Sequence, residues 1–183
     1  MLENQLKEEA FDLESTVPAG FWIRVLAYMI DGLIMLLLVV PALFIKSTTA
    51  YMAVLVPMIL YKPLLEGLLG GTAGKLAIGL RVISPEGGRI GVVGGFVRSA
   101  IFLLPTLPGA MMKIRMIDQG ISSFDPEAVQ AFQASNELLY YSNIGLSVLV
   151  IISCLVIAFT AGKRGLHDMV ADTYVIRIGK GES

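Results

Sequence analysis

The chain has 183 residues, of which 55% are hydrophobic and 16% are charged, and its formal net charge is −1. Soluble domains average about 45–50% apolar residues with glycine included and about 25% charged residues, so this chain lacks the polar side chains that a water-soluble surface needs. The composition excludes a disordered chain, a basic nucleic-acid-binding protein and a disulfide-rich secreted domain. It favours an integral membrane protein.

The first 20 residues form a polar, acidic segment that contains five carboxylates against Lys7. A secretory signal peptide begins with a basic region, so we expect this segment to be an exposed N-terminal extension instead. Three apolar runs follow that are long enough to cross a bilayer core of about 30 Å, which takes about 20 helical residues. They lie at about residues 22–45, 51–69 and 144–161.

Residues 92–112 are also apolar, but Arg98, Pro105 and Pro108 interrupt them, and a polar insertion follows at 113–143. Lys and Arg favour the cytoplasmic side of a membrane. The basic residues of 70–98 and those after residue 162 lie on one side only if 92–112 crosses. Four spans then result, with both termini cytoplasmic and the insertion outside. If 92–112 lies in the interface, three spans remain and the basic tail faces outward.

Two short apolar runs, Leu80–Ser84 and Arg89–Val92, flank the Pro/Gly turn at 85–88 and predict a β-hairpin. Residues 173–178 are candidates for a third strand. The predicted fold is therefore an all-α integral membrane protein. It has a four-helix transmembrane bundle and a small cytoplasmic β-hairpin or sheet. The membrane domain covers 21–178, between the N-terminal segment 1–20 and a tail at 179–183.

Ionisable residues inside the spans are candidate functional residues because burying a charge in lipid is costly. Arg24 and Asp31 are seven positions apart and lie on one helix face, about 10 Å apart along the axis. Asp31 is followed by fourteen uncharged residues. It either binds and releases a proton or small cation, with Arg24 setting its pKa, or forms a fixed ion pair. Arg98 needs an acidic partner or a lipid phosphate.

The C-terminal region supplies further acidic candidates. Asp168 and Asp172 are four residues apart, so they share a face if this turn is helical. His167 is the single histidine and Cys154 the single cysteine, which gives no support for a metal site or for hydrolytic chemistry. We expect His167 to cap or pack at the interface, and we expect neither a metal nor a cofactor.

The glycine-rich segment at 70–75 contains Gly71, Thr72, Gly74 and Lys75. A nucleotide-binding phosphate loop requires Gly, four residues and then Gly-Lys-Ser/Thr, and this segment lacks both the first glycine and the final hydroxyl residue. We interpret it as a turn that leaves the membrane, with Lys75 near lipid head groups.

Four motifs together resemble the RDD family of membrane proteins. They are Arg-x-x-Ala-x-x-Ile-Asp at 24–31, the Gly-rich segment with Gly-Leu-Arg-Val at 70–82, Arg98, and Gly-Leu-His-Asp-x-x-Ala-x-Thr at 165–173. The family is named for one Arg and two Asp. Arg24 and Asp31 match the first two, and Asp168 matches the third, while Asp172 holds a less regular place. The insertion at 113–143 departs from compact members.

The resemblance implies two functions of different classes. Some RDD proteins are linked to cation/proton antiport, and others accompany membrane quality-control or assembly proteins. Four spans make a thin bundle, so we expect a non-enzymatic accessory or scaffold protein that binds a membrane-protein partner or a second copy of itself. The alternative is a cation/proton antiporter that uses Asp31 and Asp168 with Arg24. Either protein would lie in a bacterial inner membrane, and neither would bind nucleic acid.

Overall fold

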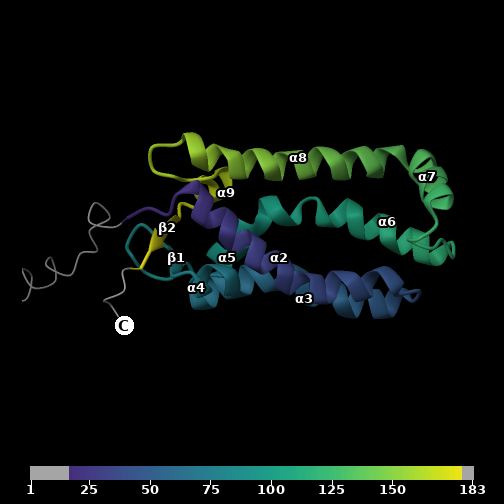
Figure 1. Cartoon of the computed structure of the whole chain (residues 1–183), viewed down its shortest axis with the longest axis horizontal. Coiled ribbons are helices and arrows are strands. Elements are labelled where there is room, and N and C mark those ends of the chain that lie inside the picture. The colour runs from purple at the N-terminus through teal and green to yellow at the C-terminus, as the bar shows by residue number, and fades with distance from the viewer. Residues whose placement is uncertain (1–16, 179–183) are drawn as a thin grey trace, which may run out of the picture.

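A computed structural model describes residues 17–178; most of the predicted N-terminal segment, and the tail at 179–183, lie outside the described residues. The elements in chain order are α2 (Phe21–Phe44), α3 (Thr48–Leu69), α4 (Ala73–Ala77), β1 (Leu80–Ile83), α5 (Gly91–Leu103), α6 (Thr106–Asp118), α7 (Pro126–Ser135), α8 (Glu137–Phe159), α9 (Leu166–Val170) and β2 (Tyr174–Arg177). The long helices follow the long axis of the molecule. The strands with α4 and α9 lie at one end, and α7 lies at the other (Figure 1).

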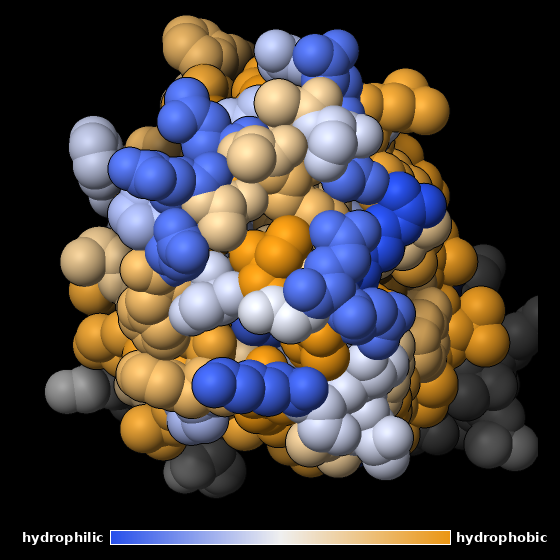
Figure 2. Space-filling view, turned by 90° about the vertical axis from the view of Figure 1, so that its right-hand side faces the viewer, coloured by the Kyte–Doolittle hydropathy of each residue, from blue (hydrophilic) through white to orange (hydrophobic). Residues whose placement is uncertain are grey.

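Three helices, α2, α3 and α8, are long and apolar enough to cross a membrane. The pair α5 and α6 has the same character but bends by 61° at its break, so the structure has three candidate spans, or four if the bent pair crosses. Apolar side chains point outward from these helices: Leu37 is 76% exposed and Phe159 is 88% exposed. At the α7 end, polar residues gather on the end face, with apolar residues along the flanks (Figure 2).

The predicted span at 92–112 is thus two helices, and two prolines explain the break. Pro105 and Pro108 have no N–H group to donate to the carbonyls four residues earlier, which interrupts the helical ladder. The Asn143 side-chain amide on α8 donates to the Pro105 carbonyl at 2.7 Å. The same carbonyl also accepts from Gly109 N at 3.3 Å, so the Asn143 bond is an additional contact that fixes α8 to the break. Asn143 lies within α8, which begins at Glu137 and not at residue 144.

The predicted hairpin is wrong, although a small sheet exists. β1 pairs antiparallel with β2, with Leu80 opposite Arg177 and Ile83 opposite Tyr174, and Pro18 makes an isolated bridge to Ile176. The turn after β1 closes through a hydrogen bond from Ser84 N to the Gly88 carbonyl. The run after this turn enters α5 at Gly91 instead of returning as a strand, because its apolar residues continue far enough to build a helix.

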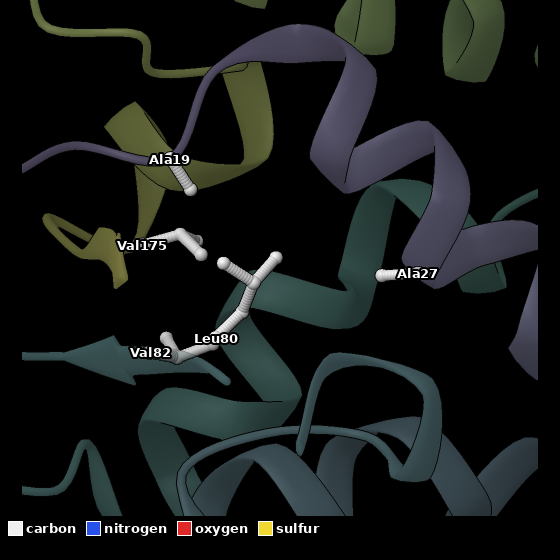
Figure 3. Packing of buried hydrophobic residues seen from close by; sticks show 5 residues of the cluster. All are labelled: Ala19, Ala27, Leu80, Val82 and Val175. Carbon is white, nitrogen blue, oxygen red and sulfur yellow. The ribbon is translucent and has the colours of Figure 1, made fainter. Parts of the chain in front are cut away.

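A small apolar core lies between the sheet and α2. Leu80, Val82 and Val175 from the strands pack with Ala19 and Ala27, and all five are at most 2% exposed (Figure 3). The sheet is therefore attached to the start of α2 and does not project freely from the bundle.

Helices α3 and α5 pack closely because glycines line their contact. A Cβ atom at Gly95 would overlap the Pro63 carbonyl oxygen and lie 3.1 Å from Gly67 N, and a Cβ atom at Gly67 would lie 2.5 Å from the Gly91 carbonyl oxygen. Small residues permit such close backbone approach in membranes. These glycines bring two charged residues on neighbouring helices, Glu66 and Arg98, within reach of each other.

Replacing Gly95 by alanine is expected to lower the free energy of unfolding by about 1–3 kcal/mol, because the added methyl group forces the two backbones apart. Gly145 on α8 is the matched control, since a Cβ there meets nothing within 4 Å. Gly145→Ala should leave stability unchanged or raise it by up to about 1 kcal/mol through better helix propensity. Thermal unfolding in detergent measures both variants, and equal losses would contradict close α3–α5 packing.

Candidate functional site

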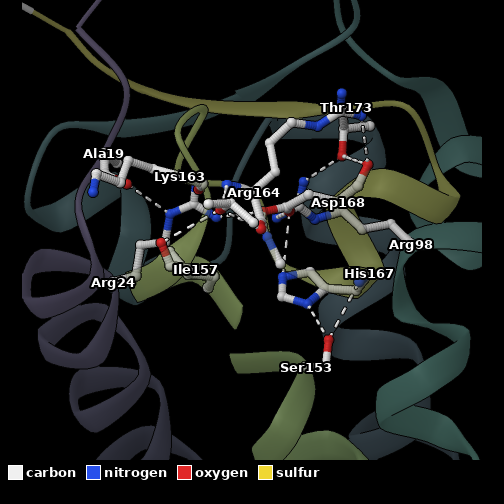
Figure 4. A network of polar contacts seen from close by, with 12 residues as sticks. Ala19, Arg24, Arg98, Ser153, Ile157, Lys163, Arg164, His167, Asp168 and Thr173 are labelled. Atoms are coloured by element: carbon white, nitrogen blue, oxygen red, sulfur yellow. Dashed lines mark hydrogen bonds and ion pairs between the residues drawn. The ribbon is translucent and has the colours of Figure 1, made fainter. Parts of the chain in front are cut away.

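A cluster of buried charged side chains lies where α2, α3, α5 and the short helices meet, and Asp168 on α9 is at its centre. Arg24 Nη1 on α2 lies 2.5 Å from Asp168 Oδ2, and Arg98 Nη2 on α5 lies 2.5 Å from Oδ1. None of these three side chains is more than 2% exposed (Figure 4). One carboxylate therefore joins α2 to α5 through two arginines.

Glu66, near the end of α3, is the second carboxylate of the cluster. Lys75 Nζ on α4 lies 2.5 Å from its Oε1 atom, and Arg98 Nε lies 2.9 Å from its Oε2 atom. Lys62, one turn earlier on α3, is more distant, with Nζ 3.9 Å from Oε1. Arg98 thus bridges the two buried carboxylates, and we call the group Arg24, Glu66, Lys75, Arg98 and Asp168 the charge network.

The remaining donors of the two arginines are satisfied by nearby groups. Arg24 donates to the carbonyls of Ala19 and Lys163 at 3.0 and 2.6 Å, and Arg98 donates to the Thr173 hydroxyl at 2.7 Å. Gly165 N donates to Asp168 at 2.9 Å. Buried ion pairs are stable only when such additional hydrogen bonds accompany them. The network fulfils this condition and fixes α2 and α5 to the C-terminal region.

Asp31 lies outside the network and has a different role. Its carboxylate accepts hydrogen bonds from the Thr72 hydroxyl at 2.6 Å, from Gly74 N at 2.8 Å and from the Tyr61 hydroxyl at 2.9 Å. Tyr61 in turn accepts from Ala73 N at 3.2 Å. The first N–H groups of a helix have no partner inside it. Asp31 on α2 therefore caps α4 across space and holds this helix against the bundle.

The glycine-rich segment explains how α4 reaches this position. Gly70 ends α3 with φ of 77°, a left-handed conformation that glycine adopts readily, and this turns the chain back toward the bundle. A Cβ atom at Gly74 would overlap the Ala27 carbonyl oxygen, so only glycine permits the contact with α2. The expected turn near lipid head groups is wrong for Lys75, whose side chain is 0% exposed.

The sequence-based candidates thus lie in different parts of the structure. Arg24, Arg98 and Asp168 are brought together, whereas Asp31 binds α4. Asp172 pairs on the surface with Arg164 at 2.7 Å and has a side chain that is 69% exposed. Of the predicted turn residues, Gly71 and Thr72 directly precede α4, while Gly74 and Lys75 lie within it.

Sequence reasoning did not include Glu66 among the network residues. The available signal was an acidic residue in the last turn of a span, four positions after Lys62.

The two titratable groups of α9, Asp168 and His167, both have pKa values below their usual ranges, for different reasons. Burial acts to raise the pKa of the Asp168 carboxyl, but Arg98 and the other nearby positive charges outweigh burial and hold the pKa well below its usual range. Burial lowers the pKa of His167 to about 2, despite the opposing charge of Asp168. Asp168 is therefore a carboxylate and His167 a neutral imidazole at physiological pH.

His167 also contacts α8. Its Nδ1 lies 2.9 Å from the Ser153 hydroxyl, its backbone N donates to the same oxygen at 3.3 Å, and its Nε2 lies 3.3 Å from Asp168 Oδ1. The arrangement fits a neutral ring in which Ser153 donates to Nδ1 and the Nε2 proton faces Asp168. His167 therefore adds α8 to the helices held by α9.

The free energy of unfolding should fall as the pH decreases from about 6.5. In this range the unfolded chain binds a proton at His167, whereas the folded chain keeps the imidazole neutral. The folded pKa lies below the unfolded one, so the slope reaches about 1.4 kcal/mol per pH unit. Between pH 6.5 and 5 the wild type should lose about 2 kcal/mol of unfolding free energy, and His167→Gln should not show this loss. His167 is the only histidine, so thermal unfolding across this range isolates it. An unchanged slope in the variant would contradict a neutral buried imidazole.

Comparison with known proteins places this geometry in a family. The family model described as "RDD family" matches residues 18–172, which include Arg24, Asp31, Arg98 and Asp168. Two relatives from Bacillus subtilis (strain 168) are similar over most of their length. Uncharacterized protein YxaI is 26% identical over 87% of this chain and 97% of its own, and Uncharacterized protein YckC is 28% identical over 90% and 88%. No solved structure matches. The chain belongs to the RDD family.

Proposed function

We propose that the protein is a non-enzymatic accessory or scaffold protein of a bacterial inner membrane. The observation that carries this proposal is that every carboxylate oxygen of the charge network is in an ion pair: each oxygen of Glu66 and Asp168 lies against a cation. A group that exchanges protons or ions must release one partner to accept another. A fully paired network acts instead as a fixed connection between α2, α3, α4, α5 and α9, and this favours a rigid membrane module.

The proposal includes four spans with both termini in the cytoplasm. The bent pair α5 and α6 would make the fourth crossing, and the end that carries α4, α9 and the sheet would face the cytoplasm. Cysteines introduced singly at residues 120–135 in a Cys154→Ser background test this topology. Labelling by a membrane-impermeant maleimide from the outside only is expected, and labelling from the cytoplasmic side only would overturn the four-span arrangement.

The contact between Ser153, His167 and Asp168 resembles a hydrolytic triad, but its setting favours a structural role. All three residues are 0% exposed, and both Asp168 oxygens lie against arginines. A nucleophile must reach a substrate, and its hydroxyl must be able to transfer a proton to the base. Here the Ser153 hydroxyl contacts the Nδ1 atom of His167, but its 0% exposure keeps it from a substrate, and its oxygen also accepts the backbone N–H of His167, so we propose no enzymatic activity.

Crosslinking in native membranes tests the scaffold role. The tagged protein is crosslinked with formaldehyde in its host, solubilised gently and purified. Recovery of one membrane protein, or of a second copy of the chain, in a fixed ratio is expected. Recovery of the protein as a monomer alone would count against the proposal.

Cation/proton antiport remains the second candidate because of Asp31. This carboxylate has no cation among the described residues and borders a cavity between α2 and α3. In proteoliposomes, salt-driven proton movement that Asp31→Asn abolishes, while the protein keeps its unfolding temperature, would favour antiport. Absence of flux from folded wild-type protein would exclude it.

A further inference from the structure

A cavity of about 270 Å³ lies beside the charge network, between α2, α3 and the break that separates α5 from α6. Its wall is mainly apolar, with Met35 on α2, Met58 and Ile59 on α3 and Leu103 before the break. Ligand sites are typically mostly apolar concave surfaces with a few placed polar groups. This cavity has that character and lies on the bundle side of a discontinuous span.

Two buried polar groups of the cavity wall have no hydrogen-bond partner. They are Nζ of Lys62 and the hydroxyl of Tyr28. The Lys62 ammonium lies 3.2 Å from the ring centroid of Phe102 and 5.0 Å from that of Tyr28. Aromatic faces attract a cation but do not neutralise it. Buried donors are usually hydrogen-bonded in folded proteins, so both groups are available to an acceptor in the cavity.

The neighbouring carboxylates do not supply that partner. Both oxygens of Glu66 are engaged at shorter distance by Lys75 and Arg98, and Asp31 is engaged by Tyr61, Thr72 and Gly74. With Asp31 counted, the four cations Arg24, Lys62, Lys75 and Arg98 face three carboxylates, which leaves one surplus positive charge in this region. An anion in the cavity would balance this surplus.

We propose that the cavity binds the carboxylate head of a single-chain fatty acid. Lys62 donates to one carboxylate oxygen in a charge-assisted hydrogen bond, and the Tyr28 hydroxyl donates to the acid as well. The acyl chain lies along Met35, Met58 and Ile59. The volume is below the range of about 300–1,000 Å³ that is usual for larger ligands, so it suits one chain better than a two-chain phospholipid.

Photocrosslinking of the full chain in phosphatidylcholine nanodiscs tests the proposal. The probe is palmitic acid with a diazirine on its chain, and adducts are mapped by mass spectrometry. Adducts are expected at the cavity wall on α2 and α3, and free palmitate should compete while its methyl ester should not. Lys62→Met should reduce labelling about tenfold, because a charged hydrogen bond is lost. Lys46→Met, the same change at an exposed loop lysine, should leave labelling unchanged.

Several outcomes would overturn the proposal. Equal competition by the methyl ester would remove the role of the carboxylate, and equal labelling by a phosphatidylglycerol probe would replace the fatty acid with a phospholipid. Labelling of Lys62→Met at the wild-type level would exclude Lys62. If Lys62→Met does not fold, Tyr28→Phe, which removes only the hydroxyl, should still reduce labelling about threefold; unchanged labelling would contradict the site.

Discussion

Asp168→Asn is expected to lower the free energy of unfolding by about 3–5 kcal/mol, because it leaves two arginines, Arg24 and Arg98, buried without their shared counter-charge. Asparagine has nearly the same shape and can still accept the hydrogen bond from Gly165 N, so the loss reports the charge and not the packing. Thermal or denaturant unfolding in mild detergent measures the change. We also expect a lower yield of folded protein from membranes.

Asp172→Asn is the matched control. It makes the same chemical change four residues away, where the carboxylate is exposed and paired with Arg164 on the surface. Asp172 has a positive φ of 43°, a conformation that asparagine also accepts. Exposed pairs contribute about 0–1 kcal/mol, so the control should remain close to wild type. Similar losses in the two variants would show that the network does not depend on the buried charge of Asp168.

Glu66→Gln is the second substitution with a large expected effect. It removes the carboxylate that both Lys75 and Arg98 contact, at a position where all three side chains are 0% exposed. A loss of about 3–5 kcal/mol is expected for the same reason as at Asp168. Glu137→Gln at the exposed start of α8 is the control and should have little effect on the unfolding temperature.

A double variant separates charge imbalance from loss of packing at Glu66. Lys75→Met removes the cation but keeps most of the apolar stem, so adding it to Glu66→Gln restores the local balance of charge. The double variant should be more stable than the sum of the two single losses predicts, because contacting residues are not additive. Additive losses would contradict direct pairing between Glu66 and Lys75.

The membrane helices could be predicted because length and apolarity alone define a span. α2 and α3 begin and end within a few residues of the predicted runs. The break between α5 and α6 was also marked in the sequence by Pro105 and Pro108, which remove backbone donors in any context. In contrast, the strand at 89–92 was predicted from a short apolar run, and such runs do not distinguish a strand from the first turn of a helix.

The site could be predicted only in part because the sequence does not specify partners. Arg24, Arg98 and Asp168 stood out as charges in apolar surroundings, but Asp31 shares a helix face with Arg24 and yet binds α4. That outcome depends on the turn at Gly70, which brings α4 back into the bundle. Lys75 was expected near lipid head groups because the local sequence does not show that the chain reverses at Gly70. That reversal is what buries its side chain.

The place of Asp168 near the end of the chain has a consequence for biosynthesis. Arg24 and Arg98 belong to helices made early, whereas their shared counter-ion lies on α9, which follows the last long helix. Chains are synthesised from the N-terminus at about 5–20 residues per second, so both guanidinium groups are made seconds before Asp168 exists. A chain truncated before α9 would leave Arg24 without a carboxylate and Arg98 with Glu66 alone, so the first helix would lack the ion pair that joins it to the rest of the bundle.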